Sequence, residues 1–198
     1  DDALLRLIQS QAAVMRYRQS HLDTADDIEE PARRMLELAS TDLLLSKWAS
    51  GSTVHTSAVD DQGAACAVTA SSGYGSGEIA PGTGIWLNNC LGELELNRHG
   101  LDASPPGRRL PSNMAPGCAR SGTSVLALGS PGADRITTAL HQFLVNFVQL
   151  GLELDEAVAH PRLHLKIDDS GDELAVEPGI ELPDLDIDVR HYDALSMY

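Results

Sequence analysis

One threonine, Thr53, stands in a sequence context that could support nucleophilic chemistry. Residues 51–57 read Gly-Ser-Thr-Val-His-Thr-Ser, so two small residues lead directly into an alternation typical of a β-strand. A threonine hydroxyl is a weak nucleophile, but a free α-amine on the same residue can activate it. Such an amine titrates near pH ~7.7–8.0 and can accept a proton at neutral pH. Because an internal threonine has only an amide nitrogen, this chemistry requires cleavage between Ser52 and Thr53. An ordinary strand start shows the same local pattern, so other residues must decide.

Five further blocks of sequence follow Thr53 toward the end of the chain. They comprise Gly82-Thr83-Gly84-Ile85-Trp86-Leu87-Asn88-Asn89 and residues 109–116, 128–136, 151–152 and 156–162. Together they resemble the γ-glutamyltransferase family, whose signature reads Pro-Gly-Thr-Gly-Ile-Leu-Leu-Asn-Asn. Order and spacing match from Thr53 almost to the end, so the resemblance covers the small, catalytic subunit. The segment Leu87–Glu93 is most similar to the bacterial γ-glutamyltransferase-like branch.

The resemblance implies a fold and a division of the chain. The expected fold class is α+β, as the C-terminal part of the four-layer αββα sandwich of N-terminal-nucleophile hydrolases. Residues 1–52 would be a helical tail of the large-subunit portion, and residues 53–198 the small catalytic subunit portion. The family has several hundred residues before the nucleophile, and this chain opens on Asp1 rather than Met. We therefore expect a piece of a longer precursor, a zymogen that cleaves itself at Ser52-Thr53.

The resemblance also implies an activity. Thr53 would attack the γ-carbonyl of a γ-glutamyl amide such as glutathione and form a γ-glutamyl ester, which water or an acceptor amine then releases. Residues 129–133 lie between a predicted strand and a helix N-terminus, where backbone N–H groups favour negative charge. The family's oxyanion-binding Gly-Gly pair matches Gly132 and Ala133. Ala133 can serve if its φ does not require glycine.

The residues that match the family's glutamate contacts depart from its pattern. The matching positions are Ser72, Cys90, Glu93, Ser112 and Asn113. Glu93 replaces an aspartate and can still pair with an ammonium group, Ser112 is retained, and Cys90 and Asn113 replace a glutamine and a serine. The loop before Gly75 is two residues shorter than in well-known members. The family's pattern can therefore be matched to either Ser71 or Ser72. We assign Ser71 to the catalytic group and Ser72 to the substrate contacts.

Two other functions stay open at this stage. One is an acylase of the same fold that acts on a different amide, since the glutamate contacts differ. The other is an uncleaved, non-catalytic family member that serves as a binding or scaffold protein. His160 and His164 are four residues apart, but Pro161 breaks the helix that would make this a metal spacing, so we expect neither metal nor cofactor.

Composition limits the partners. The net charge of −15 argues against nucleic-acid binding, and no apolar run is long enough for a membrane helix. Three cysteines at irregular spacing fit a reducing compartment, which slightly favours the cytoplasm. The expected partners are the large-subunit portion of the same precursor, as a heterodimer or a dimer of heterodimers, and a small γ-glutamyl substrate.

The elements that must position these residues follow from periodicity. We predict helices over residues 3–22, 28–39, 41–48 and 136–150 and a short one over 155–160. We predict strands over 54–58 and 65–69, joined by a turn at Asp60–Gly63, and a buried strand over 125–128. A second hairpin should pair residues 163–167 with 173–176. Residues 92–122, rich in proline, glycine and arginine, should form an ordered surface excursion.

Overall fold

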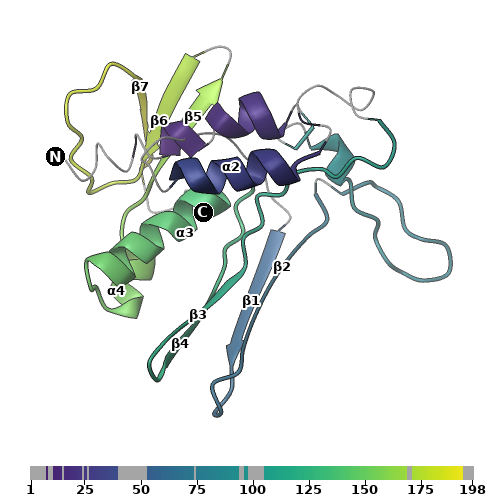
Figure 1. Ribbon diagram of the computed structural model, residues 1–198, viewed down its shortest axis with the longest axis horizontal. Helices are drawn as coiled ribbons and strands as arrows, with labels where there is room; N and C mark the ends of the chain where they lie inside the picture. Colours follow the sequence, from purple (N-terminus) through teal and green to yellow (C-terminus); the bar gives the residue numbers. More distant parts are fainter. Residues whose placement is uncertain are drawn as a thin grey trace. The chain divides into compact units, whose positions relative to one another are not determined.

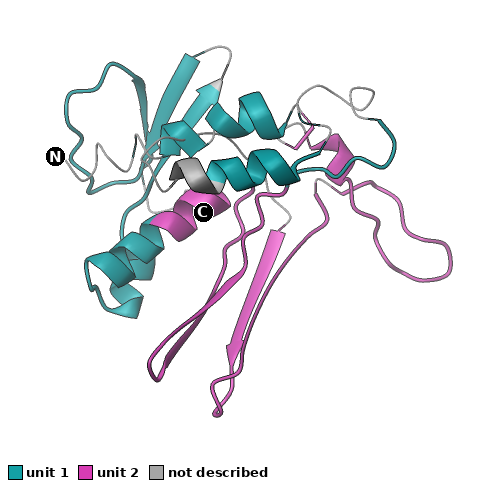
Figure 2. Ribbon diagram, in the orientation of Figure 1, with its two compact units in different colours: residues 1–48, 105–111, 142–198 teal, residues 49–104, 112–141 magenta. Residues whose placement is uncertain are grey.

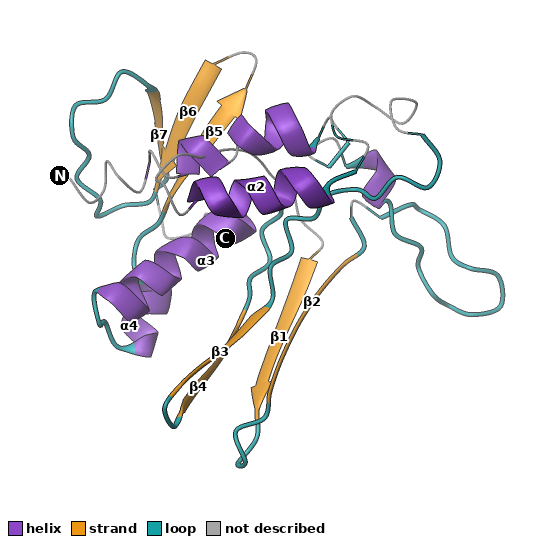
Figure 3. Ribbon diagram, in the orientation of Figure 1, coloured by secondary structure: helices purple, strands orange, loops and turns teal. Residues whose placement is uncertain are grey.

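The computed structural model describes residues 8, 11–14, 16–23, 25, 27–39, 53–73, 75–93, 96–97, 105–168 and 171–193. Its helices are η1 (Arg18–Leu22), α2 (Glu29–Ala39), η2 (Cys90–Gly92), α3 (Arg135–Leu144), η4 (Val145–Gln149) and α4 (Leu154–Ala159). Its strands are β1 (Thr53–Val59), β2 (Ala65–Ser71), β3 (Gly117–Ser121), β4 (Ser124–Leu128), β5 (Leu163–Asp168), β6 (Gly171–Val176) and β7 (Asp188–His191). Figures 1 and 3 show these helices and strands, which confirm the predicted α+β class. The predicted helix over 41–48 lies outside the described residues.

The chain divides into two compact units, which Figure 2 shows in different colours. Unit 1 comprises residues 1–48, 105–111 and 142–198, and unit 2 comprises residues 49–104 and 112–141. The predicted boundary between Ser52 and Thr53 concerns cleavage rather than compactness, and it stays a prediction.

Unit 2 is built on two antiparallel hairpins. In the first, β1 pairs with β2 and Thr53 lies opposite Ser71. The predicted turn is present: the Asp60 carboxylate accepts hydrogen bonds from the backbone N–H groups of Gln62 (3.0 Å) and Ala64 (2.7 Å), as in an Asx turn. In the second hairpin β3 pairs with β4, and β4 contacts β1 and β2. Thr53 therefore begins a strand that pairs with β2 and also contacts β4.

Strand β3 lies within the stretch that the sequence predicts to be a surface excursion. Four of its five residues are exposed, and they include Arg120 and Ser121. The strand has no apolar alternation, so periodicity does not reveal it. It forms because Gly122, at φ 58°, turns the chain back and allows pairing with β4.

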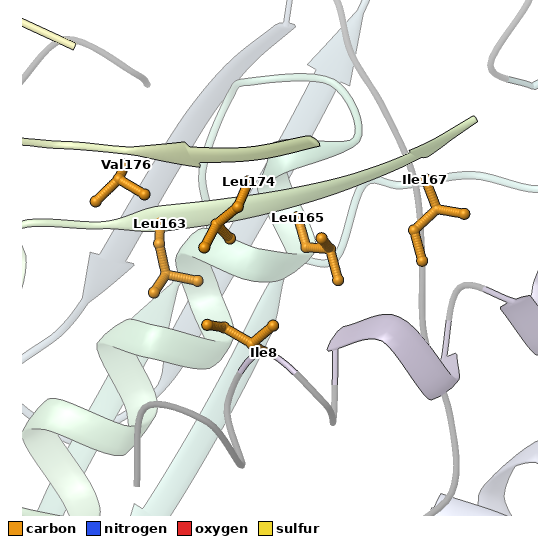
Figure 4. Packing of buried hydrophobic residues seen from close by; sticks show 6 residues of the cluster. All are labelled: Ile8, Leu163, Leu165, Ile167, Leu174 and Val176. Atoms are coloured by element: carbon orange, nitrogen blue, oxygen red, sulfur yellow. The ribbon is translucent and has the colours of Figure 1, made fainter. Parts of the chain in front are cut away.

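Unit 1 is organised around the sheet β5-β6-β7, in which β5 and β6 are antiparallel and β6 and β7 are parallel. Figure 4 shows the buried cluster on this sheet, formed by Ile8, Leu163, Leu165, Ile167, Leu174 and Val176. The three apolar residues of β5 alternate, so they share one face of the sheet. Ile8 comes from the predicted N-terminal helix and covers that face. The predicted second hairpin is thereby confirmed.

A glutamine of α3 forms two hydrogen bonds with the backbone of the edge strand β5. The Gln142 side chain donates to the Leu163 carbonyl (2.8 Å) and accepts from the Leu163 N–H (2.9 Å). Both residues are buried, and a buried backbone group without a partner would be costly. The predicted helix over 136–150 is present as α3 followed by the wider π turn η4, and it ends before Gly151 at φ 69°.

Candidate active site

A pocket in unit 2 contains most of the residues that the sequence predicts for the site. Its lining residues are Thr53, Ser71, Cys90, Glu93, Leu96, Ser112, Asn113, Met114, Ala133 and Ile136. Strands β1 and β2, helix η2, residues 112–114 and the start of α3 contribute to it. The cavity is small, ≈ 30 Å³, which is room for a water or two.

The Thr53 hydroxyl lies beside a second hydroxyl on the neighbouring strand. Thr53 Oγ1 donates a hydrogen bond to Ser71 Oγ at 3.2 Å, and the Gly73 N–H donates to the same oxygen at 3.1 Å. The cross-strand pairing of Thr53 with Ser71 places the two side chains on one face of the hairpin. The Gly73 amide fixes Ser71, and Ser71 in turn orients the Thr53 hydroxyl.

Ser72, by contrast, does not line the pocket. Its carbonyl accepts hydrogen bonds from the N–H groups of Gly75 and Asn89, each at 3.0 Å. These bonds hold the loop after β2 against the segment that leads into η2. Of the two serines, Ser71 therefore lies beside Thr53, and Ser72 connects the loop after β2 to the segment before η2.

Among the described residues that line the pocket, Glu93 alone is charged, and 8 % of its surface is exposed. It lies directly against Gly73, because a Cβ built on that glycine would come within 2.5 Å of Glu93 Oε1. Gly73 also has φ 60°, which favours glycine. A carboxylate in a buried position is a group that a positively charged partner can stabilise.

The Cys90 thiol lies beside this carboxylate. Burial raises the pKa of Cys90, and the charge of Glu93 and a hydrogen bond to it raise the pKa further. The thiol therefore stays protonated at neutral pH and donates to Glu93 rather than acting as a thiolate nucleophile.

Ser112 and Asn113 form another wall of the pocket. The Ser112 hydroxyl accepts a hydrogen bond from the Met114 N–H at 3.1 Å, which closes a short turn. Asn113 is buried, with 8 % of its surface exposed, and its side chain belongs to the pocket lining. Both residues lie where polar groups of a ligand can be bound.

Ala133 has an unusual backbone conformation. Its φ is 58°, and among the described residues it is the only non-glycine residue with a positive φ. The structure thus gives Ala133 the conformation that favours glycine, and its Cβ is accommodated at a cost of about 1–2 kcal/mol. Gly132 has φ 124°, and its carbonyl accepts from the Arg135 N–H at 3.1 Å. Within the described part of the chain, no group accepts a hydrogen bond from the N–H of Gly132 or Ala133. Ala133 lines the pocket, and Gly132 directly precedes it.

Sequence reasoning did not assign three of the lining residues, Leu96, Met114 and Ile136, to the site. Met114 lies within a block that resembles the family, so its neighbours Ser112 and Asn113 could have indicated it. Ile136 begins the apolar stripe of α3, where the same periodicity predicts core and not pocket. His160 ends α4 and His164 lies in β5. Within the described residues, no three His, Cys, Asp or Glu side chains form a metal-binding group.

The comparison with known families decides the assignment. A sequence model described as Gamma-glutamyltranspeptidase matches residues 5–186. The chain belongs to the γ-glutamyltranspeptidase family. It is 37 % identical over 148 residues to the glutathione hydrolase proenzyme of Escherichia coli, a match that covers 68 % of this chain and 25 % of that protein. It is 33 % identical over 122 residues to an Acylase ACY 1 proenzyme from a Pseudomonas species, covering 60 % of this chain and 22 % of that protein.

A solved structure supports the same assignment. A Helicobacter pylori γ-glutamyltranspeptidase mutant is 28 % identical and aligns with a TM-score of 0.56, covering 71 % of this chain and 85 % of that one. The fold is therefore the C-terminal part of the N-terminal-nucleophile hydrolase fold, as predicted. The chain spans about a quarter of the length of these two proenzymes.

Proposed function

We propose that this chain is the C-terminal part of a self-cleaving γ-glutamyl transferase and hydrolase in which Thr53 is the nucleophile. The observation that carries the proposal is the position of Thr53. It begins β1 in a pocket that also holds a hydroxyl hydrogen-bonded to it and one buried carboxylate. Family membership supports the same chemistry. One small pocket thus contains a nucleophile, a group that orients it and a site for a cation.

The first reaction would be the cleavage of the chain itself. Thr53 Oγ1 attacks the carbonyl carbon of Ser52, and the C–N bond breaks as the acyl group moves from nitrogen to oxygen. Water then hydrolyses the ester, which leaves a carboxylate on Ser52 and a free α-amine on Thr53. This division assigns residues 1–52 to the end of the large subunit and residues 53–198 to the small subunit.

The second reaction would use the amine that cleavage exposes. The α-amine of Thr53 takes the hydroxyl proton as Oγ1 attacks the γ-carbonyl of the substrate, and it returns that proton to the leaving amine. A γ-glutamyl ester remains on Thr53. Water releases it as glutamate, and an acceptor amine releases it as a new γ-glutamyl amide. Thr53 carries a β-methyl group that restricts χ1 and keeps the hydroxyl in one orientation.

The pocket offers a role for each remaining group in this scheme. The N–H groups of Gly132 and Ala133 would bind the oxyanion of the tetrahedral intermediate. Glu93 would pair with the α-ammonium group of the glutamyl moiety, while the Cys90 thiol keeps this carboxylate in place. Ser112 and Asn113 would bind the remaining polar groups of the substrate, and Ser72 would support the wall behind Ser71.

We also propose a partner for unit 2, namely the large-subunit portion of the same precursor. The outward face of the β1–β2 hairpin is uncharged and exposed throughout, and its residues are Val54, Thr56, Ala58, Cys66, Val68 and Ala70. Two-stranded hairpins are marginal in water, and continuous apolar faces of this kind are normally covered. The proenzyme names of the relatives are consistent with such a partner.

The test is to express the full-length precursor, incubate it, and determine the new N-terminus and the hydrolysis of a γ-glutamyl anilide. We expect a chain that begins Thr-Val-His-Thr-Ser and an enzyme that releases the aniline. Thr53→Ala should abolish both cleavage and turnover. Thr123→Ala, at an exposed turn of unit 2, is the matched control and should leave both unchanged. An uncut, inactive wild-type protein would favour the scaffold function and contradict the proposal.

An acylase for another amide is the second candidate. It is favoured by Cys90 and Asn113, which replace the residues that the family resemblance predicts, and by the similarity to an acylase proenzyme. A γ-glutamyl anilide and a glutaryl anilide differ only by the α-amino group that Glu93 would bind. Preference for the γ-glutamyl compound supports the first proposal, and preference for the glutaryl compound supports the acylase.

A further inference from the structure

The imidazole ring of His55, a residue of β1, is held in one orientation by two hydrogen bonds. His55 follows Thr53 by two residues on the same face of β1, which is about 6.6 Å along a strand. Its Nδ1 lies 2.8 Å from Thr69 Oγ1, and its Nε2 lies 2.7 Å from Ser57 Oγ. Hydroxyl groups both donate and accept, so these partners satisfy the ring in either neutral tautomer.

This ring occupies the space beside Gly129. A Cβ built on Gly129 would lie 2.1 Å from Cε1 and 2.2 Å from Nδ1 of His55, well inside any real contact. Gly129 is not among the glycines with a positive φ, so its backbone conformation alone does not require glycine. Glycine is needed here because the ring lies against the backbone. A side chain at residue 129 fits only if the ring moves, which would break its two hydrogen bonds.

The contact joins strand β1 to the segment that follows β4. Gly129 directly follows β4 and opens the segment 129–134, which contains Gly132 and Ala133. On the other side, His55 belongs to β1, which begins with Thr53. The ring therefore lies between the strand that begins with Thr53 and the start of the segment that contains Gly132 and Ala133, and the three atoms nearest to a Cβ built on Gly129 all belong to it.

We propose that His55 is a positioning residue whose ring, packed on Gly129, sets the distance between Thr53 Oγ1 and the N–H groups of residues 132 and 133. The inference rests on the proposed function, in which those N–H groups bind the oxyanion. Such donors act at about 2.7–3.1 Å from the oxyanion, and a displacement of roughly 1 Å can cost ~100-fold in rate. His55 is not placed as a base, since its two nitrogens face Thr69 and Ser57 and the Thr53 hydroxyl bonds to Ser71.

The test uses the full-length, processed protein in four forms: wild type, Gly129→Ala, His55→Ala and the double variant. Gly129→Ala should lower kcat for a γ-glutamyl anilide by about 10- to 100-fold while KM changes little, because the Glu93 side of the pocket is untouched. The double variant should regain about tenfold in kcat over Gly129→Ala, since the clash is removed. A role in stability alone would lower the melting temperature without this split between kcat and KM.

Gly117→Ala is the matched control. Gly117 lies on neighbouring β3, its φ is not positive, and an added Cβ would meet Leu128 Cδ2 at an ordinary 3.5 Å. We expect kcat and melting temperature close to those of the wild type. Unchanged kcat in Gly129→Ala, or a double variant no faster than Gly129→Ala, would overturn the positioning role.

Melting temperatures separate this inference from the proposed function. If the wild type hydrolyses no γ-glutamyl anilide, the proposed function fails, and the four melting temperatures still test the contact. A double variant that melts no lower than Gly129→Ala supports the His55–Gly129 contact. Additive losses in melting temperature would overturn the contact itself.

Discussion

Replacing Ala133 by glycine should leave the free energy of unfolding almost unchanged, although the residue is buried. Ala133 and Ala139 are each 6 % exposed, so burial alone predicts the same loss when either becomes glycine. They differ in backbone conformation, because Ala133 has φ 58° and Ala139 lies within helix α3. The pair therefore isolates the energy of the left-handed conformation.

The magnitudes follow from three terms. Relief of the left-handed conformation stabilises Ala133→Gly by about 1–2 kcal/mol. Loss of a buried methyl group costs about 0.8 kcal/mol, and the freer unfolded chain costs a further 0.4–1 kcal/mol or so. The expected net change is near zero, within about 1 kcal/mol. For Ala139→Gly nothing is relieved, and the loss of helix propensity and of the methyl group together cost about 2 kcal/mol.

The assay is urea denaturation of the full-length protein and both variants, with free energies compared at a common slope. We expect the midpoint of Ala133→Gly to lie near that of the wild type and the midpoint of Ala139→Gly to lie clearly lower. Turnover of Ala133→Gly should also persist, because the N–H group at residue 133 is kept. Equal losses in the two variants would refute the reasoning, since they would mean that Ala133 stores no conformational strain.

Three further predictions concern single side chains. Cys90 should react with iodoacetamide only at a higher pH than the exposed Cys118, because burial and Glu93 raise the pKa of Cys90. Mass spectrometry can measure the alkylation rates of both cysteines from neutral to alkaline pH, and equal pH profiles would contradict the prediction. Glu93→Gln should raise KM for a γ-glutamyl anilide by about 10- to 100-fold, because a charge-assisted contact is worth about 1.5–3 kcal/mol, and should leave KM for a glutaryl anilide nearly unchanged. An unchanged KM for the γ-glutamyl anilide would remove Glu93 from the substrate site. Gln142→Leu should lower the free energy of unfolding by about 2–4 kcal/mol, because it leaves the buried Leu163 N–H and carbonyl without a side-chain partner. Urea denaturation tests this against Gln142→Glu, which keeps the acceptor. A smaller loss of stability in Gln142→Leu than in Gln142→Glu would contradict the prediction.

Local patterns predicted the elements whose faces are clearly divided. The β1–β2 hairpin follows from alternation and from Asp60 in its turn, and helix α3 follows from apolar residues at helical spacing. Strand β7 was not predicted, because all four of its residues are exposed and no buried face marks it in the sequence. Leu185 and Ile187 pack against the core of unit 1. The parallel pairing of β7 with β6 depends on a long-range contact that no local pattern encodes.

The site could be predicted only as a set of residue types. The resemblance selected Thr53, Glu93, Ser112 and the segment around Ala133, because these belong to blocks with a fixed order. It could not show that Ala133 has a positive φ, since that depends on the turn into α3. It also could not show which of Ser71 and Ser72 faces Thr53, because a shorter loop shifts the alignment and only the strand register decides.

Two residues of unit 2 with nearly the same φ differ in whether the surrounding structure tolerates a side chain. Gly73 has φ 60° and Ala133 has φ 58°, so the backbone alone disfavours a Cβ equally at both. At Gly73 the added atom would also meet Glu93 Oε1 at 2.5 Å and the Asn89 backbone at 3.0 Å. At Ala133 the methyl group is already present, in a residue that lines the pocket and is 6 % exposed. A fold can tolerate conformational strain of about 1–2 kcal/mol. Strain combined with a collision against the Glu93 carboxylate would also displace the group that we expect to select the substrate. Substitution at residue 133 is therefore limited mainly by stability, and substitution at residue 73 by the charge geometry of the pocket.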